Sequence, residues 1–193
     1  HSGMTGKEAA EALLHREGIY DVRVEYVAGN LTDHYDPRSK VLRLSDATYQ
    51  QTSVAAIGVA AHECGHAIQH ARGYAPLSIR SALVPVANFG SSIAWPLIII
   101  GLIMNSQTSQ LFLNLGVIAF SMAVLFQIVT LPVEFNASRR ALKILGNTGM
   151  LYPDEVRETR KVLTAAALTY VAGAASAILQ LLRLIMISNS RRD

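Results

Sequence analysis

Two long stretches without charged residues constrain the fold of this chain more than any other feature. No Asp, Glu, Lys or Arg occurs between Ser81 and Val133, or between Val162 and Leu182. A helix needs about 20 mostly apolar residues to cross the roughly 30 Å hydrocarbon core of a bilayer. A soluble helical bundle would need charged outer faces, which these stretches lack. The sequence therefore predicts three transmembrane helices, at about residues 83–104, 111–133 and 162–182.

The residues before these spans are expected to form a small α/β part. A capping box begins a helix at Thr5, which Gly18 can end. Apolar residues alternate with charged ones over 22–26, and a second short strand is expected at Val41–Leu44, so the two strands should form a hairpin. The connection over 31–39 is expected to be a loop. Ser53 is a suitable N-cap for a further helix that reaches Ala71.

Charge distribution indicates the orientation in the membrane. A net charge of +3 could suggest nucleic-acid binding, but the basic residues lie at the ends of the spans and are mixed with acids. No nucleic-acid partner is therefore expected. The positive-inside rule places the more basic side in the cytoplasm. That side carries Arg72, Arg80, Arg139, Arg140, Lys143, Arg157, Arg160 and Lys161, whereas the other side has an uncharged turn and Arg183, Arg191 and Arg192.

The most specific motif is His62-Glu63-Cys64-Gly65-His66, which lies in the helix expected to follow Ser53. Residues four apart on a helix face the same way, so His62 and His66 can bind one tetrahedral zinc ion. Glu63 can reach an activated water without binding the ion, which makes it the candidate general base. The alternative is a helix with two surface histidines that bind no metal. The apolar neighbours of the motif argue against this alternative.

A catalytic zinc site needs a third protein ligand. Glu134 is the first charged residue after the long uncharged stretch, on the side of the membrane where the motif lies. Spacing alone leaves two roles open for Glu134: a zinc ligand, or an interfacial residue paired with Arg139 or Arg140. His70 is expected to lie too far along the helix to share the ion, and Cys64 is expected to be a packing residue. The remaining candidate ligands are Asp33, His34 and Asp36.

Several longer motifs give the chain a family resemblance. They include the segments 31–37, 131–140 and 163–170 together with the His-Glu-Cys-Gly-His motif. With these motifs the chain resembles the YugP-like neutral zinc metallopeptidases of bacterial membranes, which are relatives of the HtpX-like zincins. The resemblance covers nearly the whole chain and implies Zn²⁺, a location in the bacterial inner membrane, and Glu134 as the third, gluzincin-type ligand. HtpX-like enzymes have Asp four residues after this ligand, where Ser138 stands here. The family also has an N-terminal membrane segment, so a truncated chain is expected.

These observations together predict a mainly α integral membrane protein with a small α/β zincin-like part that contains a β-hairpin and the metal-binding helix. Residues 1–80 should form the soluble part. Residues 81–193 should supply the transmembrane helices, the third ligand and a cytoplasmic loop. The expected partners are a protein or peptide substrate and the lipid bilayer, and a second copy of the chain or a regulatory membrane protein is left open.

The expected function is that of a membrane-bound zinc metalloendopeptidase with its active site in the cytoplasm. Side-chain donors for the oxyanion are sought among His34, Tyr35 and Tyr74, and Val41–Leu44 is expected to be a sheet edge that binds an extended peptide. One alternative is a catalytically silent, zinc-containing membrane scaffold or assembly factor. Another is a metal transporter, although the polar residues Asn88, Asn114 and Gln127 of the spans are not ionisable and the histidines lie outside the spans.

Overall fold

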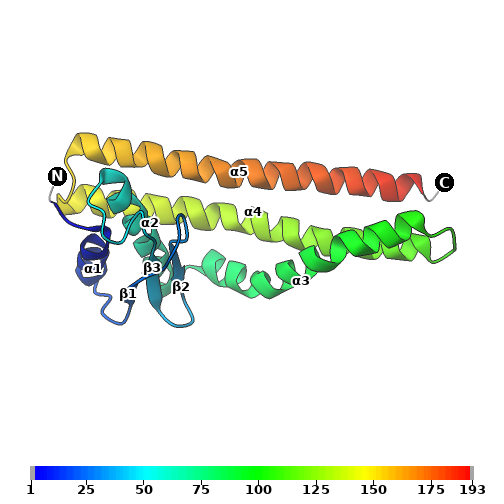
Figure 1. Cartoon of the computed structure of the whole chain (residues 1–193), viewed down its shortest axis with the longest axis horizontal. Helices are drawn as coiled ribbons and strands as arrows, with labels where there is room; N and C mark the ends of the chain where they lie inside the picture. Colours follow the sequence, from blue (N-terminus) through cyan, green and yellow to red (C-terminus); the bar gives the residue numbers. More distant parts are fainter. Residues whose placement is uncertain (1–2, 192–193) are drawn as a thin grey trace. The chain divides into compact units, whose positions relative to one another are not determined.

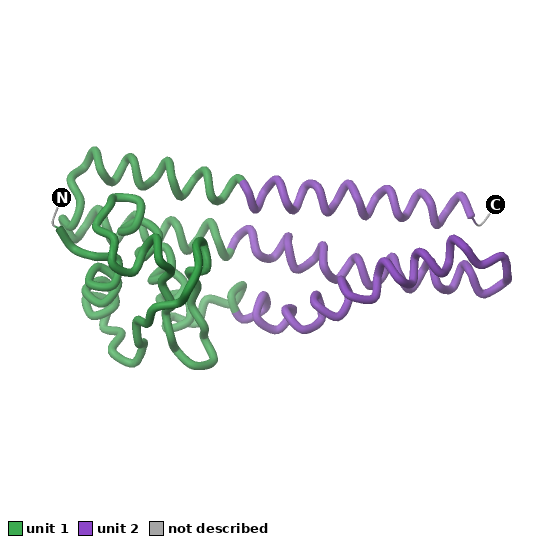
Figure 2. Tube along the Cα trace, viewed as in Figure 1, with its two compact units in different colours: residues 1–77, 133–168 green, residues 78–132, 169–193 purple. Residues whose placement is uncertain are grey.

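The computed structural model describes residues 3–191, which form two compact units (Figure 2). Unit 1 lies within residues 1–77 and 133–168, and unit 2 within residues 78–132 and 169–193. Arg192, one of the basic residues at the C-terminus, lies outside the described residues. The expected boundary near residue 80 stays a prediction, because compactness alone does not decide where an independently folding domain ends.

Unit 1 begins with the small α/β part that the sequence predicts (Figure 1). Its elements are α1 (Gly6–Arg16), β1 (Arg23–Tyr26), β2 (His34–Asp36), β3 (Val41–Leu44) and α2 (Val54–Ala71). The Thr5 capping box is present, with the Thr5 hydroxyl accepting from the Glu8 amide. The Ser53 side chain likewise accepts from the Ala56 amide and caps α2. Both helix starts are therefore where the local sequence places them.

The pairing of the strands differs from the predicted hairpin. The order in the sheet is β1-β3-β2, with β1 parallel to β3 and β2 antiparallel to β3. A hairpin is present, but it joins β2 to β3, and the segment 31–39 that was expected to be a loop contains β2. Three residues are too few to show the alternation of a strand, so β2 could not be predicted from periodicity. The expectation that Val41–Leu44 is an edge strand is wrong, because β3 is paired on both sides.

A continuous apolar core holds α2 in unit 1. It combines Leu13 and Leu14 of α1 and Leu42 and Leu44 of β3 with Ala60, Ala61 and Cys64 of α2 and Ala141 and Leu145 from a later helix. The apolar residues around the histidine motif therefore pack against neighbours on several sides. This burial fixes the position of the motif helix relative to the later segment.

Three long helices complete the chain: α3 (Ala75–Ile103), α4 (Ser109–Thr148) and α5 (Pro153–Ser190). All three are long and apolar enough to cross a membrane, by length and composition. They cover the predicted spans, except that α3 ends one residue before the expected 104, and large apolar side chains such as Phe89, Leu179 and Met186 are exposed on them. The predicted fold class, a mainly α chain with three membrane-length helices and a small sheet, is confirmed.

Candidate metal centre

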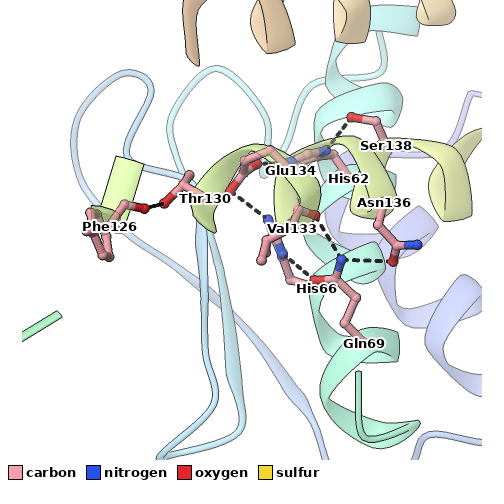
Figure 3. Close-up of polar contacts among 9 residues, drawn as sticks. All are labelled: His62, His66, Gln69, Phe126, Thr130, Val133, Glu134, Asn136 and Ser138. Carbon is pink, nitrogen blue, oxygen red and sulfur yellow. Dashed lines mark hydrogen bonds and ion pairs between the residues drawn. The ribbon is translucent and has the colours of Figure 1, made fainter. Parts of the chain in front are cut away.

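Helices α2 and α4 bring His62, His66 and Glu134 together within unit 1 (Figure 3). One ligand atom from each of the three lies within 4.8 Å of the other two. His62 Nε2 is 2.8 Å from Glu134 Oε2, and His66 Nε2 is 3.3 Å from Glu134 Oε1. No other group of three or more His, Cys, Asp or Glu side chains within residues 3–191 has this geometry.

The approach of α2 to α4 depends on Gly65, which lies between the two histidines. A Cβ atom at this position would lie 2.4 Å from the carbonyl oxygen of Ala137 on α4. Any side chain here would therefore push the two backbones apart. The glycine allows Glu134 and Ser138, which flank Ala137 on α4, to reach the histidines.

Each histidine is oriented by a hydrogen bond at Nδ1. His62 Nδ1 lies 3.0 Å from Ser138 Oγ, and His66 Nδ1 lies 2.9 Å from Gln69 Oε1 (Figure 3). Such bonds turn the other ring nitrogen toward a metal and fix the tautomer. Ser138 thus contacts His62 from the position where HtpX-like enzymes have Asp.

The amide of Gln69 is held in one orientation. Gln69 is fully buried, and its Nε2 donates to the Val133 carbonyl oxygen at 2.8 Å and to Asn136 Oδ1 at 3.0 Å. Asn136 Oδ1 also accepts from Arg140 Nε at 2.7 Å. Because the Val133 carbonyl oxygen can only accept, the NH₂ group of Gln69 faces it and Oε1 faces His66. Oε1 therefore accepts the proton of His66 Nδ1, which leaves the lone pair of a neutral ring at Nε2.

Gln69 and Asn136 are residues that the sequence analysis missed. The available signal was a glutamine that directly follows the apolar residues Ala67 and Ile68 in the motif helix, since a buried amide requires partners. The assembled donor set of two imidazole Nε2 atoms and one carboxylate is that of His₂Glu catalytic zinc sites. The three residues therefore fit a zinc ion.

The two glutamates of the site have opposite electrostatic environments. Glu63 is 8% exposed, and burial raises the pKa of its carboxyl, against the opposing charges of His66 and His62. The charges of Glu134 and Asp33 act in the same direction as burial and also raise this pKa. Burial also acts to raise the pKa of Glu134, but the neighbouring imidazoles of His62 and His66 outweigh it and hold that pKa well below its usual range.

The other candidate ligands have different partners. Asp33 accepts from the Ser45 amide at 2.7 Å and from its hydroxyl at 2.9 Å, so it anchors the chain before β2. Asp36 accepts from Ser39 Oγ at 2.8 Å. The exposed His34 lies with Nδ1 2.8 Å from the Thr32 carbonyl oxygen. None of the three joins the metal-ligand group.

Two other residues of α2, His70 and Cys64, also lie outside the metal-ligand group. His70 Nδ1 lies 2.7 Å from the hydroxyl of Tyr35, which is a candidate oxyanion donor. Cys64 is buried, with Sγ 3.6 Å from the Ala10 carbonyl oxygen. Tyr74, another candidate donor, has the Arg140 guanidinium 5.5 Å from its ring centroid.

Comparisons with known proteins relate the chain to a family of zinc metallopeptidases. A family model described as "Putative neutral zinc metallopeptidase" matches residues 1–189. The chain is also 48% identical over 192 residues to a Bacillus subtilis (strain 168) protein named "Putative membrane protease YugP", covering 100% of this chain and 84% of the relative. No solved structure matches the chain. The family implies zinc, and the relative's name and the three apolar helices support a location in a membrane. The chain belongs to the neutral zinc metallopeptidase family that this model describes.

Proposed function

We propose that this protein is a membrane-bound zinc metalloendopeptidase in which His62, His66 and Glu134 hold the ion and Glu63 is the general base. The observation that carries the proposal is the convergence of the three ligand atoms within 4.8 Å. Glu134 comes from a separate helix, far from the histidines in sequence, so the convergence is a property of the fold. The hydrogen bonds at both Nδ1 atoms support the same assignment.

The proposed chemistry divides between the ion and Glu63. When bound, zinc supplies Lewis acidity, which activates water near neutral pH and stabilises developing negative charge. Glu63 takes the proton of the attacking water and passes it to the leaving amine of the peptide. Its buried position raises its pKa and so favours proton uptake, as a general base that works near neutral pH requires. The low pKa of Glu134 keeps this carboxylate ionised for its role as a ligand.

We further propose that the active site lies on the cytoplasmic side of the bacterial inner membrane. Six basic residues lie between the uncharged stretch of α4 and that of α5. They belong to the same compact unit as the metal centre. The positive-inside rule assigns such a region to the cytoplasm. The six are Arg139, Arg140, Lys143, Arg157, Arg160 and Lys161.

A Glu63→Gln variant tests the catalytic role. The amide has nearly the same shape but cannot take a proton, so we expect normal zinc content and a loss of proteolysis of at least about 100-fold. Zinc is measured by metal analysis of the purified full chain, and proteolysis with an unfolded protein substrate. Glu158→Gln, an exposed change on α5, is the matched control and should leave both unchanged.

The same measurements separate the alternatives. A wild type that holds zinc but cleaves nothing would favour the scaffold or assembly factor. A structural zinc site has four protein ligands, whereas the group found among residues 3–191 has three. Zinc flux into liposomes that does not depend on Glu63 would favour a transporter. Glu63→Gln with full proteolysis would contradict the assignment of the general base.

A further inference from the structure

A groove of about 430 Å³ lies between α4 and α5 inside unit 1, beside the metal centre. Its apolar wall includes Phe135 from α4 and Leu163 and Ala167 from α5. Ser138 also lines the groove, and its hydroxyl is the group that contacts His62 Nδ1 at 3.0 Å. The proposed peptidase function does not assign a role to this groove.

The groove has an apolar end and a basic end. The uncharged stretch of α4 ends at Val133, so the lining residues of α4, from Phe135 to Lys143, lie beyond its end. On α5 the lining residues Leu163, Thr164 and Ala167 lie inside the uncharged stretch, and Arg160 lies just before it begins. At 1.5 Å per residue, each wall spans roughly 10–12 Å. Both helices thus place apolar residues toward the hydrocarbon boundary and cations beyond it.

The cations of the groove have no acidic partner. Arg139, Lys143 and Arg160 line it, and their residues are exposed. No Asp or Glu lines the groove, and no ion pair of these three cations is found in the part of the chain that the structure describes. Three cations around one apolar floor attract an anion that carries an apolar portion.

We propose that this groove binds an anionic phospholipid. The phosphate lies among Arg139, Lys143 and Arg160, and an acyl chain follows Phe135, Leu163 and Ala167 into the bilayer. Basic residues just outside a membrane span attract anionic headgroups, and basic recesses between membrane helices bind them specifically. The lipid would contact Ser138 and so lie next to the side chain that orients His62. This binding does not depend on whether the protein cleaves peptides.

The test compares two double variants of the full chain that remove the same charge. Lys143→Gln with Arg160→Gln removes two groove cations, whereas Arg157→Gln with Lys161→Gln removes two neighbouring cations of α5 that do not line the groove. Native mass spectrometry measures retention of phosphatidylglycerol and of phosphatidylcholine with the same acyl chains. We expect the wild type to prefer phosphatidylglycerol. Each groove cation contributes about fivefold, so the first pair should lose about 25-fold in affinity and the second less than about threefold.

Several outcomes would overturn the proposal. Equal losses in the two double variants would show a general attraction to basic surface, and no loss in the groove variant would show that the lipid binds elsewhere. Full competition by glycerol 3-phosphate at the lipid's own concentration would assign the site to free phosphate. Tighter binding of an acidic peptide than of the lipid would assign the groove to substrate. Thermal unfolding of both variants near the wild-type temperature checks that exposed substitutions have not altered the fold.

Discussion

At the scale of single residues, the metal centre depends on side chains that hold the histidines as well as on the ligands. Gln69 links His66 to the Val133 carbonyl oxygen and to Asn136, and both of these lie on α4 next to Glu134. One buried amide therefore orients a histidine of α2 and ties it to the helix of the third ligand.

A Gln69→Met variant tests this linkage. Methionine has a similar shape but leaves His66 Nδ1 without its acceptor, so we expect zinc affinity to fall about 10- to 100-fold. Competition with a chelator measures the affinity, and Gln51→Met, at an exposed position, is the control. Circular dichroism of the metal-free protein shows whether the variant is folded. Unchanged zinc affinity in a folded Gln69→Met protein would show that the amide does not orient His66.

At the scale of elements, the site is a contact between two helices that differ in kind. Helix α2 is short and buried in the α/β core, whereas α4 is a long helix whose uncharged stretch is apolar enough to cross a membrane. The ligands meet because α4 continues past that stretch without a break, through Pro132 and on to Thr148. Gly65 sets how closely the two helices approach.

A Gly65→Ala variant should therefore damage the site without removing any ligand. The new methyl group would meet a backbone carbonyl at 2.4 Å, and such overpacking costs about 1–3 kcal/mol and would move Glu134 away from the histidines. We expect a lower unfolding temperature together with a zinc affinity at least about tenfold weaker.

The control for this change lies on α4 itself. Gly146 has no atom within 4 Å of an added Cβ, so Gly146→Ala should keep full zinc affinity and stabilise the helix by up to about 1 kcal/mol. Chelator competition and chemical unfolding measure the two effects. A Gly65→Ala protein that binds zinc as tightly as the wild type would contradict the role of the close helix approach.

At the scale of the whole molecule, charge at the ends of the long helices determines the expected topology. A single native cysteine, Cys64, is buried, so it should not react with a maleimide that cannot cross membranes. Cysteines introduced in place of Arg38, in the β2–β3 turn, and Gln107, in the α3–α4 turn, can then report which side each turn occupies. Both positions are exposed.

We expect Arg38→Cys to react in inverted membrane vesicles and Gln107→Cys in right-side-out vesicles. The physical reason is the excess of Lys and Arg around the metal-bearing part and its absence from the α3–α4 turn. The unsubstituted chain is the control for labelling of Cys64. The opposite pattern would place the active site outside the cytoplasm and would leave the proposed metal site itself unaffected.

The sequence alone determined the features that depend on local or compositional physics. The uncharged stretches predict membrane helices because charged groups are costly to remove from water. The caps at Thr5 and Ser53 form hydrogen bonds within the next three residues. The relative positions of His62, Glu63 and His66 follow from helical geometry. The pairing of β2 with β3, the Gln69 hydrogen bonds and the contact at Gly65 were decided by the tertiary structure. The Gln69 hydrogen bonds to α4 and the contact at Gly65 join residues that are distant in sequence, and β2 is too short to show a period. Only the packing of the chain determines which of these groups meet. Glu134 lies between the two cases, since its sequence position suggested the same side of the membrane as the histidine motif, but only the packing of α4 on α2 brought it to the histidines.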